Sequence, residues 1–180
     1  GLDIAMAHWG TPRDQNNPGE TETLWRNETI GGTIRFTAVS QDAGISAELG
    51  LDRTGGVLGE DHDYTFAPGF ADIDDDGDQD LLSVADFGSS RVFINDGDGT
   101  FTNINDPTII TDTNGMGAAI GDYDGDGDMD WFVSSIDGNR LYQNIGGNFT
   151  YPSEAQDVDK GGWGWGSCFA DFNADGRLDI

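Results

Sequence analysis

A repeat with a period of about 50 residues is the feature that most constrains this chain. Segments 72–80, 122–130 and 171–179 align without gaps, share the pattern D-x-[D/N]-x-D-G-x-x-D, and start 50 and 49 residues apart. The first two are each followed by a short apolar run, 81–85 and 131–135. A unit that recurs at a spacing of this size indicates a repeat architecture, in which one supersecondary unit packs against the next.

The flanks of these segments repeat as well, and they have the character of short strands. Arg91–Asn95 matches Arg140–Asn144, and Gly99–Thr102 matches Gly147–Thr150. The runs are four to six residues long, rich in β-branched and aromatic types, and bounded by the glycine, asparagine and aspartate of tight turns. The chain shows no sustained 3.6-residue periodicity, so helix should be scarce. The sequence therefore predicts an all-β fold.

Both ends of the chain fit the same repeat. Residues 1–4 match residues 177–180, so Asp3 stands where an acidic segment would end. The chain thus opens just after one such segment and closes just after another, which predicts about three repeat periods cut at the same phase. The expected periods are 1–71, 72–121 and 122–170, with the start of a further unit at 171–180.

The first period is longer than the others. Its surplus residues fall in two segments, 11–22 and roughly 47–68. Insertions in repeat proteins map to loops, often on a binding face. A surface insertion without any partner is an equally open interpretation.

The acidic segments have the composition and spacing of calcium-binding loops. Oxygens at positions 1, 3 and 5 converge on one point, glycine at position 6 permits a sharp reversal, and a carbonyl at position 7 with a carboxylate at position 9 completes the shell. Such a set of hard oxygens suits Ca²⁺ better than Mg²⁺ or zinc. The predicted ligands are Asp72, Asp74, Asp76, Asp78 and Asp80; Asp122, Asp124, Asp126, Asp128 and Asp130; and Asp171, Asn173, Asp175, Arg177 and Asp179.

Position 7 of each loop is expected to contribute only its backbone carbonyl. The side chains of Asp78 and Asp128 should then point to solvent, and Arg177 can occupy this position in the third loop. Asn173 stands at position 3 there, and its amide oxygen can still act as a ligand. Without a cation, the six carboxylates within 72–80 would repel one another. Solvated acidic turns are the alternative interpretation.

An EF-hand does not fit these loops. That motif requires a bidentate glutamate at position 12 and helices on both sides. Position 12 is Ser83 in the first loop and Val133 in the second, and the residues after position 9 are strand-like. A nonapeptide β-helix is excluded by the spacing of about 50 residues.

The charge of the chain limits its partners. It carries 34 acidic against 8 basic residues, a formal net charge of −26, and 14 of the acids lie in the three loops. We therefore expect cations as partners, and neither nucleic acid nor direct insertion into a membrane. The 19 aromatic residues and the regular apolar runs argue against a disordered acidic chain. Cys168 is the single cysteine, so no disulfide can form within the chain.

The segments Phe70–Leu82 and Ile120–Trp131 resemble FG-GAP repeats, also called VCBS repeats, of integrin α-subunit-like β-propellers. Arg140–Asn144, Gly147–Phe149 and Gly162–Gly166 are similar to a subgroup of secreted proteins related to cartilage acidic protein, which often carry an ASPIC/UnbV tail. The resemblance implies four-stranded blades, usually seven to a ring, with Ca²⁺ in a loop between the first two strands of a blade. It also implies an extracellular or cell-surface location, and binding rather than catalysis.

These expectations combine into one leading hypothesis. A closed propeller needs at least four blades, so the chain is interpreted as part of a longer ring. It would be a calcium-stabilised, non-enzymatic module that serves adhesion and binds another protein or a glycan. The alternative is the scaffold of an extracellular carbohydrate-active enzyme, for which the sequence offers no clear acid–base pair. Trp163 and Trp165 suit inter-blade packing better than carbohydrate stacking. His62 could join a further metal site in the second insertion, but a solvated polar loop is the favoured interpretation.

Overall fold

The computed structural model describes residues 2–12, 23–49, 62–152 and 157–180. Within these ranges the regular elements are β-strands, and no helix occurs. This agrees with the prediction from the turn-rich, non-helical sequence pattern.

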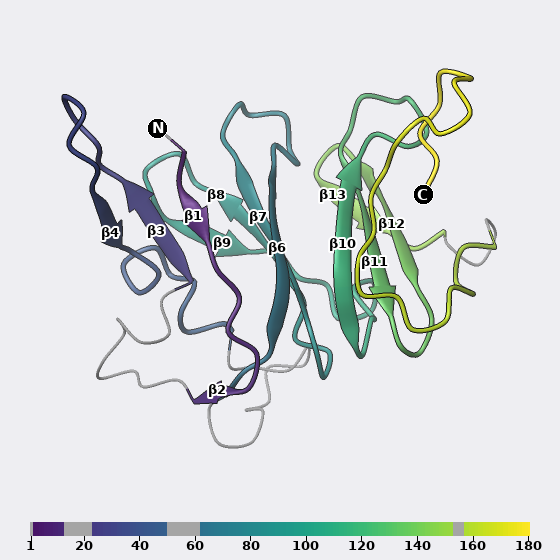
Figure 1. The fold of residues 1–180 in the computed structure, drawn as a ribbon, viewed down its shortest axis with the longest axis horizontal. Coiled ribbons are helices and arrows are strands. Elements are labelled where there is room, and N and C mark those ends of the chain that lie inside the picture. The colour runs from purple at the N-terminus through teal and green to yellow at the C-terminus, as the bar shows by residue number, and fades with distance from the viewer. Residues whose placement is uncertain (1, 13–22, 50–61, 153–156) are drawn as a thin grey trace.

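Two matching four-stranded sheets form most of the molecule (Figure 1). In each, consecutive strands are antiparallel neighbours, so each sheet is a simple meander. The first sheet contains β6 (Thr65–Ala71), β7 (Asp80–Ala85), β8 (Arg91–Asn95) and β9 (Phe101–Asn103). The second contains β10 (Gly115–Gly121), β11 (Asp130–Ser135), β12 (Arg140–Ile145) and β13 (Asn148–Thr150).

A three-stranded sheet precedes them and stands beside the first four-stranded sheet (Figure 1). Its order is β1 (Ile4–Ala5), β3 (Leu24–Asn27) and β4 (Phe36–Ala38). The three antiparallel sheets of three to four strands are consistent with propeller blades, which confirms the predicted fold class.

The two segments interpreted as insertions lie largely outside the described residues, at 13–22 and 50–61. Their described ends form a small pair of strands, β2 (Thr11–Pro12) and β5 (His62–Asp63). Residues 65–68 of the second segment belong to β6. The strand thus begins earlier than the sequence pattern suggested.

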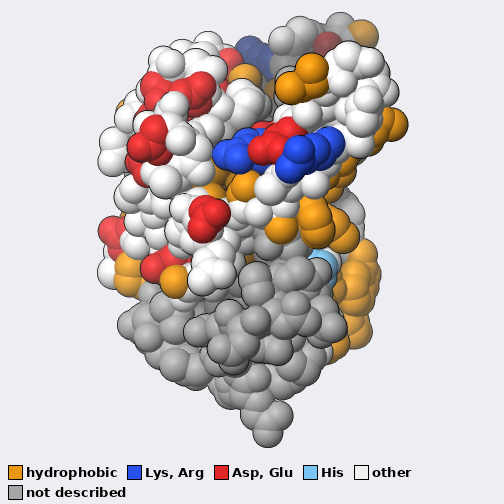
Figure 2. All heavy atoms as spheres, turned by 90° about the vertical axis from the view of Figure 1, so that its left-hand side faces the viewer, with side chains coloured by type: hydrophobic (Ala, Val, Ile, Leu, Met, Phe, Trp, Pro, Cys, Tyr) orange, Lys and Arg blue, Asp and Glu red, His pale blue; other side chains and the backbone are white. Residues whose placement is uncertain are grey.

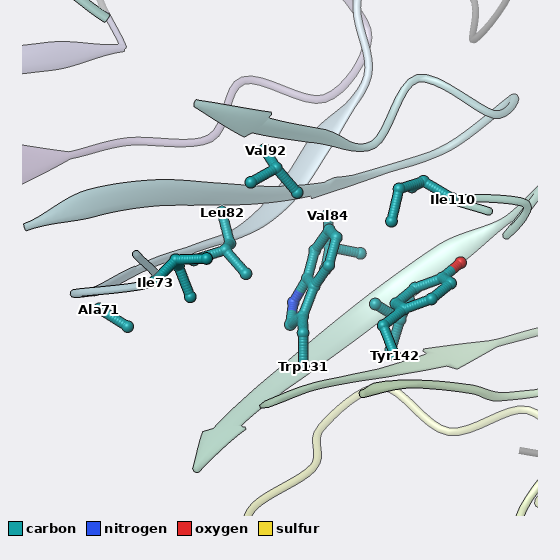
Figure 3. Close-up of a cluster of buried hydrophobic side chains, with 9 residues drawn as sticks. Ala71, Ile73, Leu82, Val84, Val92, Ile110, Trp131 and Tyr142 are labelled. Atoms are coloured by element: carbon teal, nitrogen blue, oxygen red, sulfur yellow. The ribbon is translucent and has the colours of Figure 1, made fainter. Parts of the chain in front are cut away.

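The main core lies between the two four-stranded sheets (Figure 3). Leu82 and Val84 of β7 pack in one cluster with Trp131 of β11 and Tyr142 of β12, and all four side chains are buried. The rings of Trp131 and Tyr142 are 5.5 Å apart between centroids. The burial of these apolar side chains holds the two sheets together, because each Å² of buried apolar surface contributes about 25 cal/mol.

A second core lies on the other face of the first four-stranded sheet. Leu81 of β7 and Phe93 of β8 pack there with Leu24 and Ile45. Successive side chains of a strand point to opposite faces, so Leu81 and Leu82 belong to different cores. The whole of β7 is buried, as expected for a strand with a packed layer on each side.

A buried polar network also joins the two sheets. The carboxylate of Asp112, in the connection between them, accepts hydrogen bonds from Ser90 Oγ at 2.6 Å and from the Tyr142 hydroxyl at 2.7 Å. Burial raises the pKa of Asp112 and that of Tyr142. The network fixes the connecting segment to both sheets.

Candidate metal-binding loops

The first acidic loop connects β6 to β7 and is shaped by its own carboxylates. Asp72 Oδ2 accepts the backbone N–H of Gly77 at 3.0 Å, and Asp76 Oδ1 accepts that of Asp78 at 2.8 Å. Gly77 has a φ of 95°, in the region that favours glycine. The turn predicted at position 6 is therefore present.

Asp80, at position 9, fastens this loop to the sheet. Its side chain is fully buried and accepts the backbone N–H groups of Ile73 at 2.7 Å and Asn95 at 2.8 Å. Burial raises the pKa of Asp80, and the nearby carboxylates of Asp74 and Asp76 raise it further. A carboxylate held in this way is fixed in position and could serve as a metal ligand.

Three carboxylates of the first loop converge. An oxygen of each of Asp72, Asp74 and Asp80 lies within 4.8 Å of the others. Asp72 Oδ1 is buried and has no hydrogen-bond partner. Because an unsatisfied buried oxygen is costly, this atom fits a site in which a cation is the missing partner. Asp76 is not part of the convergent group.

The second loop, between β10 and β11, repeats this geometry. Oxygens of Asp122, Asp124 and Asp130 again lie within 4.8 Å of one another. Asp130 is fully buried and accepts the backbone N–H groups of Tyr123 at 3.0 Å and Asn144 at 2.8 Å. Burial, with a further contribution from nearby carboxylates, raises the pKa of Asp130 to about 6.

The third loop has the same internal hydrogen bonds. Asp171 accepts the backbone N–H groups of Asp175 at 3.0 Å and Gly176 at 2.9 Å, and Asp179 accepts that of Phe172 at 3.0 Å. Asp175 accepts the N–H of Arg177 at 2.9 Å. The described carboxylates of this loop do not form a convergent group of three, and its ligand set remains a prediction.

The side chain of Asp128 is half-buried and hydrogen-bonded, whereas we expected position 7 of the second loop to point to solvent. Its Oδ2 accepts the backbone N–H of Gly146 at 2.6 Å, in the turn between β12 and β13. Asp78, at the matching position of the first loop, is exposed as expected. The carboxylate of Asp128 therefore ties its loop to the β12–β13 turn at the same end of the sheet.

A repeated asparagine was missed as a functional residue. It is the last or next-to-last residue of its strand, and its backbone N–H donates to the position-9 aspartate. The signal was visible, because each strand run matched in the sequence ends in asparagine. The three pairs are Asn27 with Asp3, Asn95 with Asp80, and Asn144 with Asp130.

Asn144 also reaches the neighbouring sheet. Its Nδ2 donates to the backbone carbonyl of Ile73, inside the first loop, at 2.7 Å. Nearby, Gly147 approaches Asp74 so closely that a Cβ built on it would lie 3.1 Å from the Asp74 Cβ. The second four-stranded sheet thus contacts the first acidic loop through Asn144 and Gly147. We call this contact the clamp between sheets.

A left-handed residue at position 4 is common to the three loops. The φ angles are 62° at Asp75, 81° at Gly125 and 60° at Ala174. Glycine adopts this conformation without strain, whereas alanine adopts it at a cost of about 1 kcal/mol. The sequence pattern, which leaves position 4 open, gave no indication of it.

Two basic residues in or next to the three-stranded sheet form ion pairs with an acidic residue of their own region. Arg26 and Arg35 both pair with Glu28, at 3.0 and 3.3 Å. Figure 2 shows the side of the molecule that lies at the left of Figure 1. Basic side chains there have acidic ones between them, and other acidic side chains lie apart from this group. These bases are therefore not available to neutralise the convergent carboxylates.

Fold and loops together define a class: a propeller-type repeat module with an acidic loop between the first two strands of each complete sheet. The model of the FG-GAP-like repeat matches residues 72–133 and 125–180, more than half of the chain. The chain belongs to the FG-GAP-like repeat family, which is defined by a structural module and not by a reaction. No curated protein matches the chain. Across the described residues, no helix has the length and apolar character needed to cross a membrane.

Proposed function

We propose that the chain is a calcium-stabilised binding module of a secreted or cell-surface protein. The observation that carries the metal assignment is the buried, unpartnered Oδ1 of Asp72 beside Asp74 and Asp80. Oxygen ligands alone, with a glycine reversal at position 6, are the donor set of Ca²⁺. The ion would be structural, because it joins the two ends of a loop that links neighbouring strands.

The second loop supports the same assignment. Its three convergent carboxylates occupy the same repeat positions, and the pKa of Asp130 is raised by burial with a contribution from neighbouring carboxylates. A divalent cation would relieve this repulsion and favour the ionised form. Calcium is the proposed ion at both loops and, by pattern, at the third.

Thermal unfolding across Ca²⁺ concentrations tests this role. A site with a dissociation constant on the order of 10⁻⁴ M adds about 2.7 kcal/mol when the ion is at 100 times that concentration. For a chain of this size, each kcal/mol shifts the midpoint by about 2–4 °C. We expect a rise of several degrees per site with Ca²⁺ and a much smaller one with Mg²⁺. No rise with Ca²⁺ in a folded chain would refute the metal assignment.

Two variants in one loop make the test specific. Asp74→Asn removes a converging carboxylate and should abolish most of the calcium-dependent rise in melting temperature that one site contributes. Asp75→Asn removes the same charge from the next residue, which is exposed and outside the group, and should keep the full calcium response. Equal losses in both variants would indicate a diffuse charge effect instead of a defined site.

The proposed binding role rests on the family and on the architecture. FG-GAP-like repeats often mediate protein binding, and propellers present loops at the ends of rigid sheets. An affinity for Ca²⁺ near 10⁻⁴–10⁻³ M would suit an extracellular module, where the ion is abundant. Secretion or surface display of the full protein, tested by fractionation of cells that produce it, is part of this proposal.

A further inference from the structure

A groove of about 440 Å³ lies where the outer strands of the two four-stranded sheets approach each other. Its apolar lining consists of Ile94, Ile104, Ile109, Ile110 and Phe149, and all of these except Ile104 belong to or pack against the core between the sheets. Ile110 is buried, whereas Ile104 is 38% exposed. The groove therefore offers an aliphatic surface at the outer boundary of the main core.

Three carboxylates stand around this aliphatic surface, from Asp74, Asp96 and Asp106. Asp106 accepts the N–H and hydroxyl of Thr108, and these hydrogen bonds lower the pKa of Asp106, so it is ionised near neutral pH. Asp96 accepts hydroxyl hydrogen bonds from Thr100 and Thr102. Among the described residues that line the groove, none is basic.

The groove is bounded by the first acidic loop and by a turn that the second acidic loop holds in place. Asp74 belongs to the convergent group of the first loop. The opposite wall includes Gly146 and Gly147, in the turn that Asp128 of the second loop holds by a 2.6 Å hydrogen bond. Filling the loops with a cation would fix both walls, and would engage Asp74 while leaving Asp96 and Asp106 free to meet a ligand.

We propose that this groove receives an arginine or lysine side chain on an extended segment of a partner protein. The long methylene stem of such a side chain covers apolar surface while its charged end stays at the rim. The cationic end can then form charge-assisted hydrogen bonds to Asp96 and Asp106. This inference rests on the proposed binding role, and it names the surface and the chemistry of the partner.

Methyl NMR of the calcium-saturated chain, labelled at isoleucine, tests the groove directly. The probe is the peptide acetyl-Gly-Arg-Gly-amide, and its neutral match replaces arginine by citrulline, which keeps the shape and removes the charge. We expect the arginine peptide to shift the methyl signals of Ile94, Ile104 and Ile109. The citrulline peptide should bind with at most about a tenth of the affinity of the arginine peptide, since one charge-assisted contact contributes about 1.4 kcal/mol or more.

Matched charge variants complete the experiment. Asp96→Asn and Asp106→Asn should each weaken the arginine peptide about five- to tenfold, while the amide oxygen can still accept the threonine hydrogen bonds. Asp42→Asn removes one exposed charge next to Ala43, which packs in the core on the other face of this sheet, and should bind as the unaltered chain does.

Three results would overturn the proposal: equal binding of the citrulline peptide, an equal loss in Asp42→Asn, or shifts centred on isoleucines outside the groove. Shifts of the groove methyls by a neutral oligosaccharide, without any response to arginine, would assign the groove to a glycan and also overturn it. The calcium-dependent rise in melting temperature is measured separately. If the peptide experiment overturns the groove proposal while the calcium response is intact, the metal assignment is unaffected.

Discussion

The second and third acidic loops share one sequence pattern but differ in how they are anchored. Asp130 is fully buried and accepts two backbone N–H groups, from Tyr123 and from Asn144 on the strand beyond. Asp179, at the same position, is half-buried and accepts the N–H of Phe172 within its own loop. In the second loop, the strand that carries Asn144 supplies the second donor.

The bonds inside the two loops are nevertheless the same. Asp122 accepts the N–H of Gly127 at 3.1 Å, and Asp171 accepts that of Gly176 at 2.9 Å. Both glycines have positive φ angles, 102° and 87°. The turn therefore follows from the nine residues of the loop, whereas the position of the last carboxylate depends on the sheet that surrounds it.

The largest effect is expected from removing the position-9 carboxylate in each loop. Asp130→Ala leaves two backbone donors without their acceptor in a buried place and should lower the free energy of unfolding by about 3 kcal/mol. Asp179→Ala loses one half-exposed bond and should cost about 1 kcal/mol or less. Urea denaturation with a chelator present measures both without a metal contribution. Equal losses would show that the surrounding sheet adds no anchoring.

A smaller effect is expected from the asparagines that follow the loops. Asn144→Ala removes the cross-sheet bond to the Ile73 carbonyl and should cost about 2 kcal/mol. Asn95→Ala removes a bond to the Gln79 carbonyl in the same repeat and should cost about 1 kcal/mol, because that site is partly exposed. Denaturation of the two variants side by side checks the difference. A larger loss in Asn95→Ala would contradict the role assigned to the clamp between sheets.

The smallest effect concerns position 4. Ala174→Gly relieves a left-handed alanine and should stabilise the chain by up to about 1 kcal/mol. Gly125→Ala introduces the same strain into the second loop and should destabilise it by a similar amount. Thermal melts of the pair measure opposite shifts of a few degrees. Shifts of the same sign would mean that the loop backbones are not equivalent.

The sequence pattern predicted the features that depend only on residues near one another in the chain. The all-β fold, the reversal at Gly77 and the loop carboxylates all follow from local spacing. The anchoring of Asp128 by Gly146 and the reach of Asn144 to Ile73 could not be predicted, because both depend on how a distant turn or a second sheet is placed. The left-handed residue at position 4 was hidden for another reason: aspartate, glycine and alanine occupy it in turn, so composition gives no common signal.

The clamp between sheets has a direction. Asn144 of one repeat donates to Ile73 in the loop of the repeat before it, so donor and acceptor surfaces lie on opposite sides of the unit. Such a contact is heterologous: it joins the tail of one unit to the head of the next and never pairs two identical faces. Heterologous contacts propagate, and they close into a ring when the rotation per unit divides the circle. The side-chain amide of Asn144 therefore contributes, beside the apolar core, to the order of these two repeats, and a repeat inserted in reverse would find no partner for it.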